Sequence, residues 1–351
     1  MTDRRPPDHP AADVAPNPLP RIDAAIAERA ALIDERQRTA FRLFNGHLEG
    51  DPRYVIDAYG STAVVFHHAA PHDDDPELRA VVAHLRARLP WLRAVVVKER
   101  EGATEAARRG RVVAAPVGGE PLATEVREHG VRYAVDLLLN QDAGFYLDTC
   151  QLRRWLLEHS AGKTVLNTFA YTGSLGVAAR AGGAARVLHT DLNPRFLDLA
   201  KASYALNGFP VERRDFQARD FFSFVRGLKL RGERFDTVIL DPPFFSSTRG
   251  GTVDLGRHAA RLINKLRPLV RSGGTLVAVN NALYLSGAAY LRELEALCAD
   301  GWLSIERIVD VPEDVTGFPS TRGGTSLVDP APFPHATKIV LLTVRHRPPD
   351  G

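Results

Sequence analysis

Hydrophobic residues in the second half of the chain fall into a strict alternation of strand-like and helix-like segments. Short runs of Val, Leu and Ile predict strands buried on both faces, and longer segments with apolar residues three or four positions apart predict amphipathic helices. The predicted strands cover residues 164–167, 186–190, 235–240, 275–279, 303–309 and 337–345, and the predicted helices residues 174–181, 194–206, 255–270 and 287–299. This alternation predicts an α/β fold with a parallel sheet covered on both faces.

The first half of the chain shows a less regular pattern. It predicts helices over residues 21–38 and 77–89, strands over 54–57, 62–66 and 93–97, and a hairpin that pairs 124–126 with 133–136. Residues 101–119 are rich in Gly, Ala and Arg, which favours a mobile connection. We therefore expect a proline-rich flexible tail over residues 1–20, a small α+β domain over 21–119 that is a possible contact for substrate or RNA, and the α/β domain over 120–351.

Composition narrows the classes of protein to which the chain can belong. Its 351 residues suffice for two domains, and a hydrophobic content of 44% with 25% charged residues is typical of a soluble globular protein. No apolar run reaches the roughly 20 residues of a membrane helix, and the N-terminus lacks the apolar core of a signal peptide. We expect a cytoplasmic protein, and its net charge of +3 permits a nucleic-acid partner without requiring one.

Few residues suggest a metal site or a disulfide. Cys150 and Cys298 are the two cysteines, which excludes a disulfide scaffold and a cysteine-rich zinc module. His67 and His68, followed by the His-Asp-Asp-Asp run at 72–75, resemble a metal cluster, but a polar loop explains them equally simply because no other ligand spacing supports a site. We expect no metal.

A rigid acidic group follows the strand predicted over residues 235–240. It consists of Asp241, Pro242, Pro243 and Phe244. The prolines fix φ and lack amide donors, so their carbonyls face outward, and the ring offers a stacking face. Carboxylate and carbonyl oxygens can hold an amino group, which makes the group a seat for a planar, nitrogen-bearing acceptor such as a nucleobase. The alternative is a simple strand end with a proline turn, followed by a loop of small residues.

The turn after the first strand of the α/β domain argues against a dinucleotide. A dinucleotide fold requires glycine at the position of Tyr171, and a side chain there blocks the close approach of a pyrophosphate. Gly173 and Gly176 still allow a tight turn and close packing of helix on strand.

Two acids complete the outline of a nucleoside pocket. Asp191 ends the second strand, where a carboxylate can accept both ribose hydroxyls, whereas Asn193 fits the helix N-cap better. Asp220 either caps the following helix or contributes to holding an adenine amino group. S-adenosylmethionine is the commonest cofactor of this shape.

Several segments resemble a known family. Residues 141–148 (QDAGFYLD), 167–173 (NTFAYTG), 189–191 (HTD) and 241–245 (DPPFF) are similar to the class I S-adenosylmethionine-dependent methyltransferases of large-subunit ribosomal RNA, in particular to the cytosine-5 branch and the related guanine-N7 domain. The resemblance covers residues 130–345 and extends weakly upstream, into residues 42–60. It implies a Rossmann-like sheet of seven strands, the last antiparallel, preceded by a small α+β domain.

The resemblance also implies roles for individual residues. The cofactor would be held by Gln141, Asn167, Phe169, Tyr171, Gly173, Asp191, Asp220 and Asp241. In the family the turn after the first strand binds the methionine part, the acid of the second strand binds the ribose, and the acid of the third strand lies at the adenine. Asp241, Pro242 and Phe244 would form the catalytic acceptor site.

The chain departs from the cytosine-5 branch in three respects. We expect no counterpart of the N-terminal RNA-binding module of that branch, the cysteine that the branch carries after the fifth strand gives way to the Asn-Asn-Ala run at 280–282, and the acceptor loop has a second Phe followed by Ser-Ser-Thr-Arg-Gly-Gly-Thr. Methylation of a pyrimidine at carbon 5 requires a nucleophile, usually a thiolate, so a nitrogen acceptor is favoured. Cys150 could approach the site or be an inert, partly buried thiol.

A repeated string suggests substrate contacts. The run Ser-Thr-Arg-Gly-Gly-Thr occurs at residues 247–252 and again at 320–325. We expect Arg249 and Arg322 to converge on the acceptor and grip a phosphate or carboxylate, together with Phe244 and Phe245 as substrate contacts. The alternative is two solvated glycine turns.

The sequence therefore predicts an S-adenosylmethionine-dependent methyltransferase that acts on a base nitrogen, with ribosomal RNA as its partner. One alternative keeps the cofactor and takes a small molecule or a protein side chain as acceptor. The other is a non-catalytic RNA-binding or assembly protein with a relic cofactor pocket.

Overall fold

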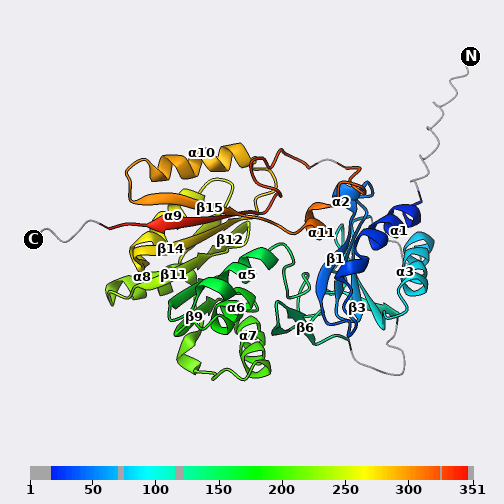
Figure 1. Cartoon of the computed structure of the whole chain (residues 1–351), viewed down its shortest axis with the longest axis horizontal. Helices are drawn as coiled ribbons and strands as arrows, with labels where there is room; N and C mark the ends of the chain where they lie inside the picture. The colour runs from blue at the N-terminus through cyan, green and yellow to red at the C-terminus, as the bar shows by residue number, and fades with distance from the viewer. Residues whose placement is uncertain (1–16, 70–74, 115–121, 325, 347–351) are drawn as a thin grey trace, which may run out of the picture.

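The computed structural model describes residues 17–69, 75–114, 122–324 and 326–346, which form two large sheets with their flanking helices and two short hairpins (Figure 1). Most of the tail predicted over residues 1–20 lies outside the described residues. So does the boundary predicted near residue 119, and the division into domains remains a prediction.

The larger sheet has seven strands in the order β10-β9-β8-β11-β14-β16-β15. The strands are β8 (Thr164–Thr168), β9 (Arg186–Asp191), β10 (Phe216–Ala218), β11 (Phe235–Leu240), β14 (Val270–Asn280), β15 (Leu303–Val309) and β16 (Lys338–Val344). The pairs from β10 to β14 are parallel, and β16 runs antiparallel to both of its neighbours. The predicted Rossmann-like fold with an antiparallel last strand is confirmed.

Helices cover both faces of this sheet because successive strand residues point to opposite sides. On one face Val165, Val187 and Ile239 join the core under the first group of helices: α5 (Cys150–His159), α6 (Ser174–Ala181) and α7 (Pro194–Leu206). Their neighbours Leu166 and Leu188 join the core under the second group: α8 (Phe221–Leu230), α9 (Ala259–Leu266) and α10 (Gly287–Cys298).

The smaller sheet has five strands in sequential order and is mixed, with only β3 and β4 parallel. It consists of β1 (Ala40–Asn45), β2 (Tyr54–Tyr59), β3 (Thr62–His67), β4 (Ala94–Glu99) and β5 (Arg111–Ala114), accompanied by α1 (Leu19–Glu28), α2 (Gly46–Glu49), α3 (Pro76–Arg88) and α4 (Glu105–Arg109). Asp75 caps α3 by accepting hydrogen bonds from two amides of its first turn. One face packs on α1 and α3, and the other joins the core of the larger sheet through the hairpin β6 (Glu125–Glu128) and β7 (Val131–Ala134).

The chain between β15 and β16 crosses to the smaller sheet, as the orange segment of Figure 1 shows. Its helix α11 (Glu313–Thr316) lies against β1, and the Asp314 carboxylate accepts a hydrogen bond from the Arg42 amide at 2.8 Å. Arg29, which is fully buried, donates to the Asp314 carbonyl and pairs with Glu49 at 2.9 Å. These contacts connect the two sheets by polar groups as well as by the shared core.

Several local predictions are wrong in detail. The helix predicted over residues 21–38 ends at Glu28, and the connection predicted over 101–119 contains α4 and β5. The loop of small residues after Asp241 is a hairpin of β12 (Phe245–Thr248) and β13 (Gly251–Asp254). No helix in the described part of the chain is long and apolar enough to span a bilayer.

The packing of α6 on β9 generates a prediction about stability. A Cβ at Gly176 would lie 2.2 Å from the ring of His189, which is fully buried and stacked on Phe216. Gly176→Ala should therefore lower the free energy of unfolding by about 1–3 kcal/mol, measured by urea denaturation. Gly323→Ala is the matched control because no atom lies within 4 Å of its added Cβ; equal stability of the two variants would contradict the packing described.

Candidate active site

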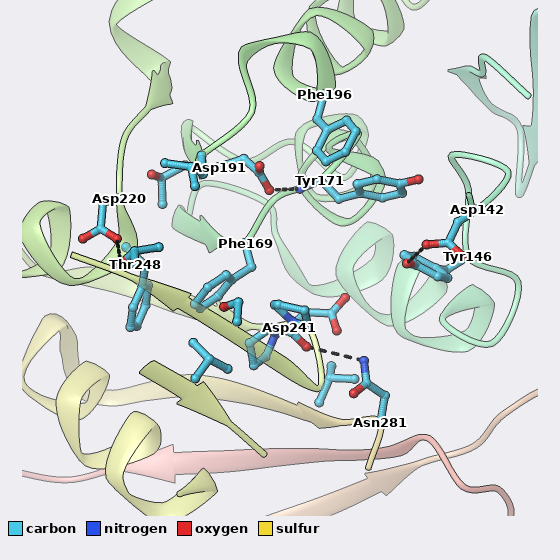
Figure 2. A pocket seen from close by; sticks show the side chains of 18 of the residues that line it. Asp142, Tyr146, Phe169, Tyr171, Asp191, Phe196, Asp220, Asp241, Thr248 and Asn281 are labelled. Atoms are coloured by element: carbon cyan, nitrogen blue, oxygen red, sulfur yellow. Dashed lines mark hydrogen bonds between the residues drawn. The ribbon is translucent and has the colours of Figure 1, made fainter. Parts of the chain in front are cut away.

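A cavity of about 440 Å³ lies at the carboxyl ends of the parallel strands (Figure 2). It is centred between β8 and β11, which are adjacent in the sheet although their following helices, α6 and α9, cover opposite faces. Ligands of open α/β sheets bind at such a switch point. The sequence predicted a site at this edge.

The turn after β8 forms one wall of the cavity and adopts an unusual backbone. Phe169 and Tyr171 have φ values of 52° and 50°, which residues other than glycine rarely adopt. The Tyr171 amide donates to the Asp191 carboxylate at 2.8 Å, which holds the turn in this conformation. The Phe169 ring stacks on Phe221 at 4.4 Å, and the Tyr171 ring meets Phe196 edge-on at 4.6 Å. The result is a largely aromatic wall.

Three residues predicted from the family pattern do not line the cavity. Gly173 caps α6 with a φ of 81°, and a Cβ there would lie 2.4 Å from that of Ala200, so close packing requires glycine. Asn167 is fully buried in β8, with its amide 3.4 Å from His189 Nδ1. Gln141 is exposed and does not line the cavity, although its neighbours Asn140 and Asp142 do.

Both predicted acids line the cavity and already accept hydrogen bonds. Asp191 accepts from the amides of Tyr171 and Asn193, at 2.8 and 2.9 Å, and burial raises the pKa of its carboxyl. Asp220 caps α8 through the Ser223 amide and accepts from the Thr248 hydroxyl at 2.6 Å. Each carboxylate oxygen keeps a further lone pair, so both acids can accept from a ligand.

Asp241 lies opposite the turn, at the end of β11. Burial of its carboxyl, reinforced by the nearby Asp148 carboxylate and opposed by Arg153, raises its pKa from 3.8 to about 7. The Pro242 carbonyl next to it accepts a hydrogen bond from the Asn281 side chain at 3.4 Å. The other side-chain atom of Asn281, its Oδ1, is buried without a hydrogen-bond partner among the described residues. A group that can gain or lose a proton near neutral pH therefore stands beside an unused acceptor.

Four of the predicted substrate contacts do not line this cavity. Phe244 and Phe245 are 45% and 60% exposed and are absent from its lining. Arg249 sits in the β12–β13 turn, where the neighbouring Gly250 packs on Asp220. Arg322 donates to the Thr316 carbonyl at 2.7 Å, beside the smaller sheet.

The predicted convergence of Arg249 and Arg322 is therefore wrong. The two similar strings belong to different parts of the molecule. One turns a hairpin against α8, and the other belongs to the segment that crosses to α2, where the Gly323 amide bonds the Leu48 carbonyl at 2.9 Å. The last residue of the second string, Thr325, lies outside the described residues.

Cys150 does not line the cavity. Its sulfur lies 3.3 Å from His129 Nε2, and burial beside Glu128 raises the pKa of the thiol to about 12, so it is a poor nucleophile. Glu128, His129 and Cys150 together have ligand atoms within 4.8 Å of one another. The Glu128 carboxylate already forms an ion pair at 2.5 Å with Arg153, whose side chain is fully buried. Residues 72–74 of the suggested histidine cluster lie outside the described residues, and His67 lies 2.9 Å from Glu99 and 3.5 Å from Asp75.

The lining residues that sequence reasoning missed include Asp142, Tyr146, Asp148 and Asn281. The first three lie within the segment 141–148 that carries the family resemblance, of which only Gln141 was selected. Asn281 follows β14, the strand next to β11, so the position of its strand in the sheet could have identified it.

Comparison with known proteins identifies the family. Residues 65–327 match the S-adenosylmethionine-dependent methyltransferase family. A protein named ribosomal RNA large subunit methyltransferase I from Aeromonas salmonicida is 31% identical over 94% of this chain and 80% of its own length. The protein of the same name from Photobacterium profundum is 30% identical over 84% of this chain and 72% of its own length.

Solved structures share the fold. A protein described as a methyltransferase, SMU.776, complexed with SAH has a TM-score of 0.77 at 22% identity, covering 93% of this chain and 80% of its own. A SAM-dependent methyltransferase from Agrobacterium tumefaciens has a TM-score of 0.57 at 18% identity, covering 84% of this chain and 88% of its own.

The raised pKa of Asp241 predicts a pH dependence of stability. Between about pH 4 and pH 7 the folded protein holds a proton on Asp241 that the unfolded chain has released, so this carboxyl lowers stability progressively as the pH rises through that window. The advantage in melting temperature of Asp241→Asn over the wild type should therefore grow between about pH 5 and pH 8. A difference that stays constant over this range would contradict the assigned environment.

Proposed function

The chain belongs to the family of S-adenosylmethionine-dependent methyltransferases, and on this premise we propose that it methylates a base nitrogen in ribosomal RNA. The RNA acceptor is supported by relatives that are named as large-subunit ribosomal RNA methyltransferases and align with nearly the whole chain. Such an acceptor implies a cytoplasmic reaction. The observation that carries the choice of a nitrogen is that Asp241 and Asn281, whose amide donates to the Pro242 carbonyl, line the same cavity, with no thiol among the described residues that line it.

The cavity fits the nucleoside part of the cofactor. Its walls are the aromatic rings of Phe169, Tyr171 and Phe221, and carboxylates lie at the ends of the second and third strands. We propose that Asp191 accepts the ribose hydroxyls and that Asp220 and the adjacent backbone lie at the adenine. The turn from Phe169 to Gly173, shaped by its positive φ values, would face the methionine part. Asn167 and Gly173 would then support this turn from behind, and Gln141 would have no direct contact.

The acceptor nitrogen would lie between Asp241, the Pro242 carbonyl and Asn281. When bound, S-adenosylmethionine supplies an electrophilic methyl group on a sulfonium centre. The protein's main contribution is to orient the nitrogen lone pair toward that methyl group. Asp241 can accept a hydrogen bond from the amino group and take up its proton, because a carboxyl with a pKa of about 7 is poised for this at neutral pH.

The remaining predicted contacts lie at the entrance. The exposed rings of Phe244 and Phe245 offer stacking faces to RNA outside the cavity. Arg249, in the neighbouring hairpin turn, can approach a phosphate of the same strand. Arg322 has no part in this proposal because its guanidinium bonds the Thr316 carbonyl.

Identification of the acceptor needs one labelling experiment. Purified protein and radiolabelled S-adenosylmethionine are incubated with ribosomal RNA from a strain that lacks the gene, and the nucleosides are then analysed by mass spectrometry. We expect label in a base methylated at nitrogen. Label at carbon 5 of a pyrimidine would contradict the nitrogen assignment. Transfer to a small molecule or protein but not to RNA would support the alternative acceptors.

Replacement of Asp241 tests the acceptor site. Asp241→Asn and Asp241→Ala should lower kcat at least about 100-fold while binding of S-adenosylhomocysteine is retained, because proton transfer and orientation are lost but the nucleoside contacts are not. Asp198→Asn, an exposed carboxylate on α7, is the matched control. Near-normal turnover of Asp241→Asn would refute the role.

Replacement of Asp191 tests the cofactor site. Asp191→Ala should weaken the binding of S-adenosylhomocysteine about 10- to 100-fold in calorimetric titration, since it removes charged acceptors from the ribose and from the Tyr171 amide. Asp215→Asn, an acid that pairs with Arg186 and does not line the cavity, should bind as the wild type does. Equal affinities of the two variants would rule out the assigned ribose contact.

A further inference from the structure

A second, larger cavity of about 880 Å³ lies between the smaller sheet and the segment before α5. Its walls include residues of β1, β2 and β3 and the loops that follow β3 and β4, among them Val55, Phe66, His68 and Arg100. No residue to which the proposed mechanism assigns a role lines it.

The two cavities meet at one wall. Asp142, Tyr146 and Asp148 line both of them. Tyr146 is 44% exposed, its hydroxyl donates to Asp142 at 2.9 Å, and its ring lies 5.3 Å from that of Tyr171 (Figure 2). A polymer whose acceptor group reaches Asp241 can therefore continue past Tyr146 into the second cavity.

Several planar side chains line this cavity. The Arg100 guanidinium lies over the Phe66 ring, 4.6 Å from its centroid. The rings of His47 and His68 meet edge to face at 4.9 Å. Planar side chains of this kind are what unpaired bases stack on in RNA-binding proteins.

The two arginines of the cavity each lie close to a carboxylate, and the Asp148 carboxylate also lines it. Arg42 is paired with Asp57 at 2.8 Å, and Arg100 lies 3.3 Å from Asp142. Burial lowers the pKa of His47 and lowers that of His68 to about 4, so both imidazoles are neutral near pH 7. A neutral imidazole offers one donor and one acceptor, which suits the edge of a base better than a phosphate.

We propose that the second cavity binds an unpaired nucleobase of the acceptor RNA next to the nucleotide that is methylated. The inference rests on the proposed RNA acceptor and adds a site that reads the neighbouring nucleotide. The base would stack on the Arg100–Phe66 face and present its polar edge to His47 and His68. The shared wall at Tyr146 sets the separation between this base and the methylated one.

Paired variants and altered substrates test the proposal together. The double variant His47→Ala/His68→Ala should raise the KM for an RNA fragment roughly tenfold, with kcat and the affinity for S-adenosylhomocysteine unchanged, because base contacts are lost remote from the donor. His84→Ala is the matched control, since this histidine pairs with Asp23 on the far side of the smaller sheet. If the double variant does not fold, the milder variant His68→Gln is measured in its place, and the same rise in KM is expected.

A second measurement separates direct contact from a structural effect. RNA fragments with a single abasic site on either side of the acceptor are assayed with the wild type and the double variant. One abasic site should raise the KM of the wild type roughly tenfold and should leave that of the variant nearly unaltered, because the contact is already absent. An equal abasic penalty in both proteins, or an unchanged KM in the double variant, would overturn this inference while the proposed function stands. A wild type that methylates no RNA would overturn both.

Discussion

The hydrogen bond from the Tyr171 amide to the Asp191 carboxylate determines the geometry of the candidate active site. It joins the turn after β8 to the end of β9 and holds two aromatic residues in a left-handed conformation that they rarely adopt. The same carboxylate also bonds the Asn193 amide, where α7 begins. One acid therefore sets the shape of the turn, the start of a helix and the position of an acceptor for the cofactor. The location of this acid depends in turn on the strand order, which places the end of β9 next to the end of β8.

Burial raises the pKa of the Asp191 and Asp241 carboxyls, but their neighbours act in different directions. Backbone amides oppose the rise at Asp191, whereas the nearby Asp148 carboxylate adds to it at Asp241, where the pKa reaches about 7. Two carboxylates at the ends of the strands on either side of β8 thus acquire different chemistry from their surroundings. Asn281 is consistent with this arrangement, because an amide beside a proton acceptor suits an amino group and offers no nucleophile to a ring carbon.

Much of this could be predicted from the sequence, and the failures have physical causes. Helices α6 and α7 and strands β11 and β15 have the predicted bounds, because periodicity and caps such as Asn193 define them locally. The β12–β13 hairpin was missed because its strands are short and half exposed, and β1 because the irregularity between Arg42 and Phe44 interrupts its alternating pattern. Arg322 was misplaced because the segment between β15 and β16 is held by buried partners, Arg29 and Glu49, that no local pattern reveals. The second cavity is lined by segments that are far apart in the sequence, so no local pattern predicts it.

The central claim is that donor and acceptor meet between the turn after β8 and Asp241. A crystal structure of the protein with S-adenosylhomocysteine tests it most directly. The account predicts the ribose hydroxyls on Asp191, the adenine beside Asp220, and the sulfur directed across the switch point toward Asp241 and Pro242. A sulfur atom turned away from Asp241, or a cofactor bound in the second cavity, would contradict it.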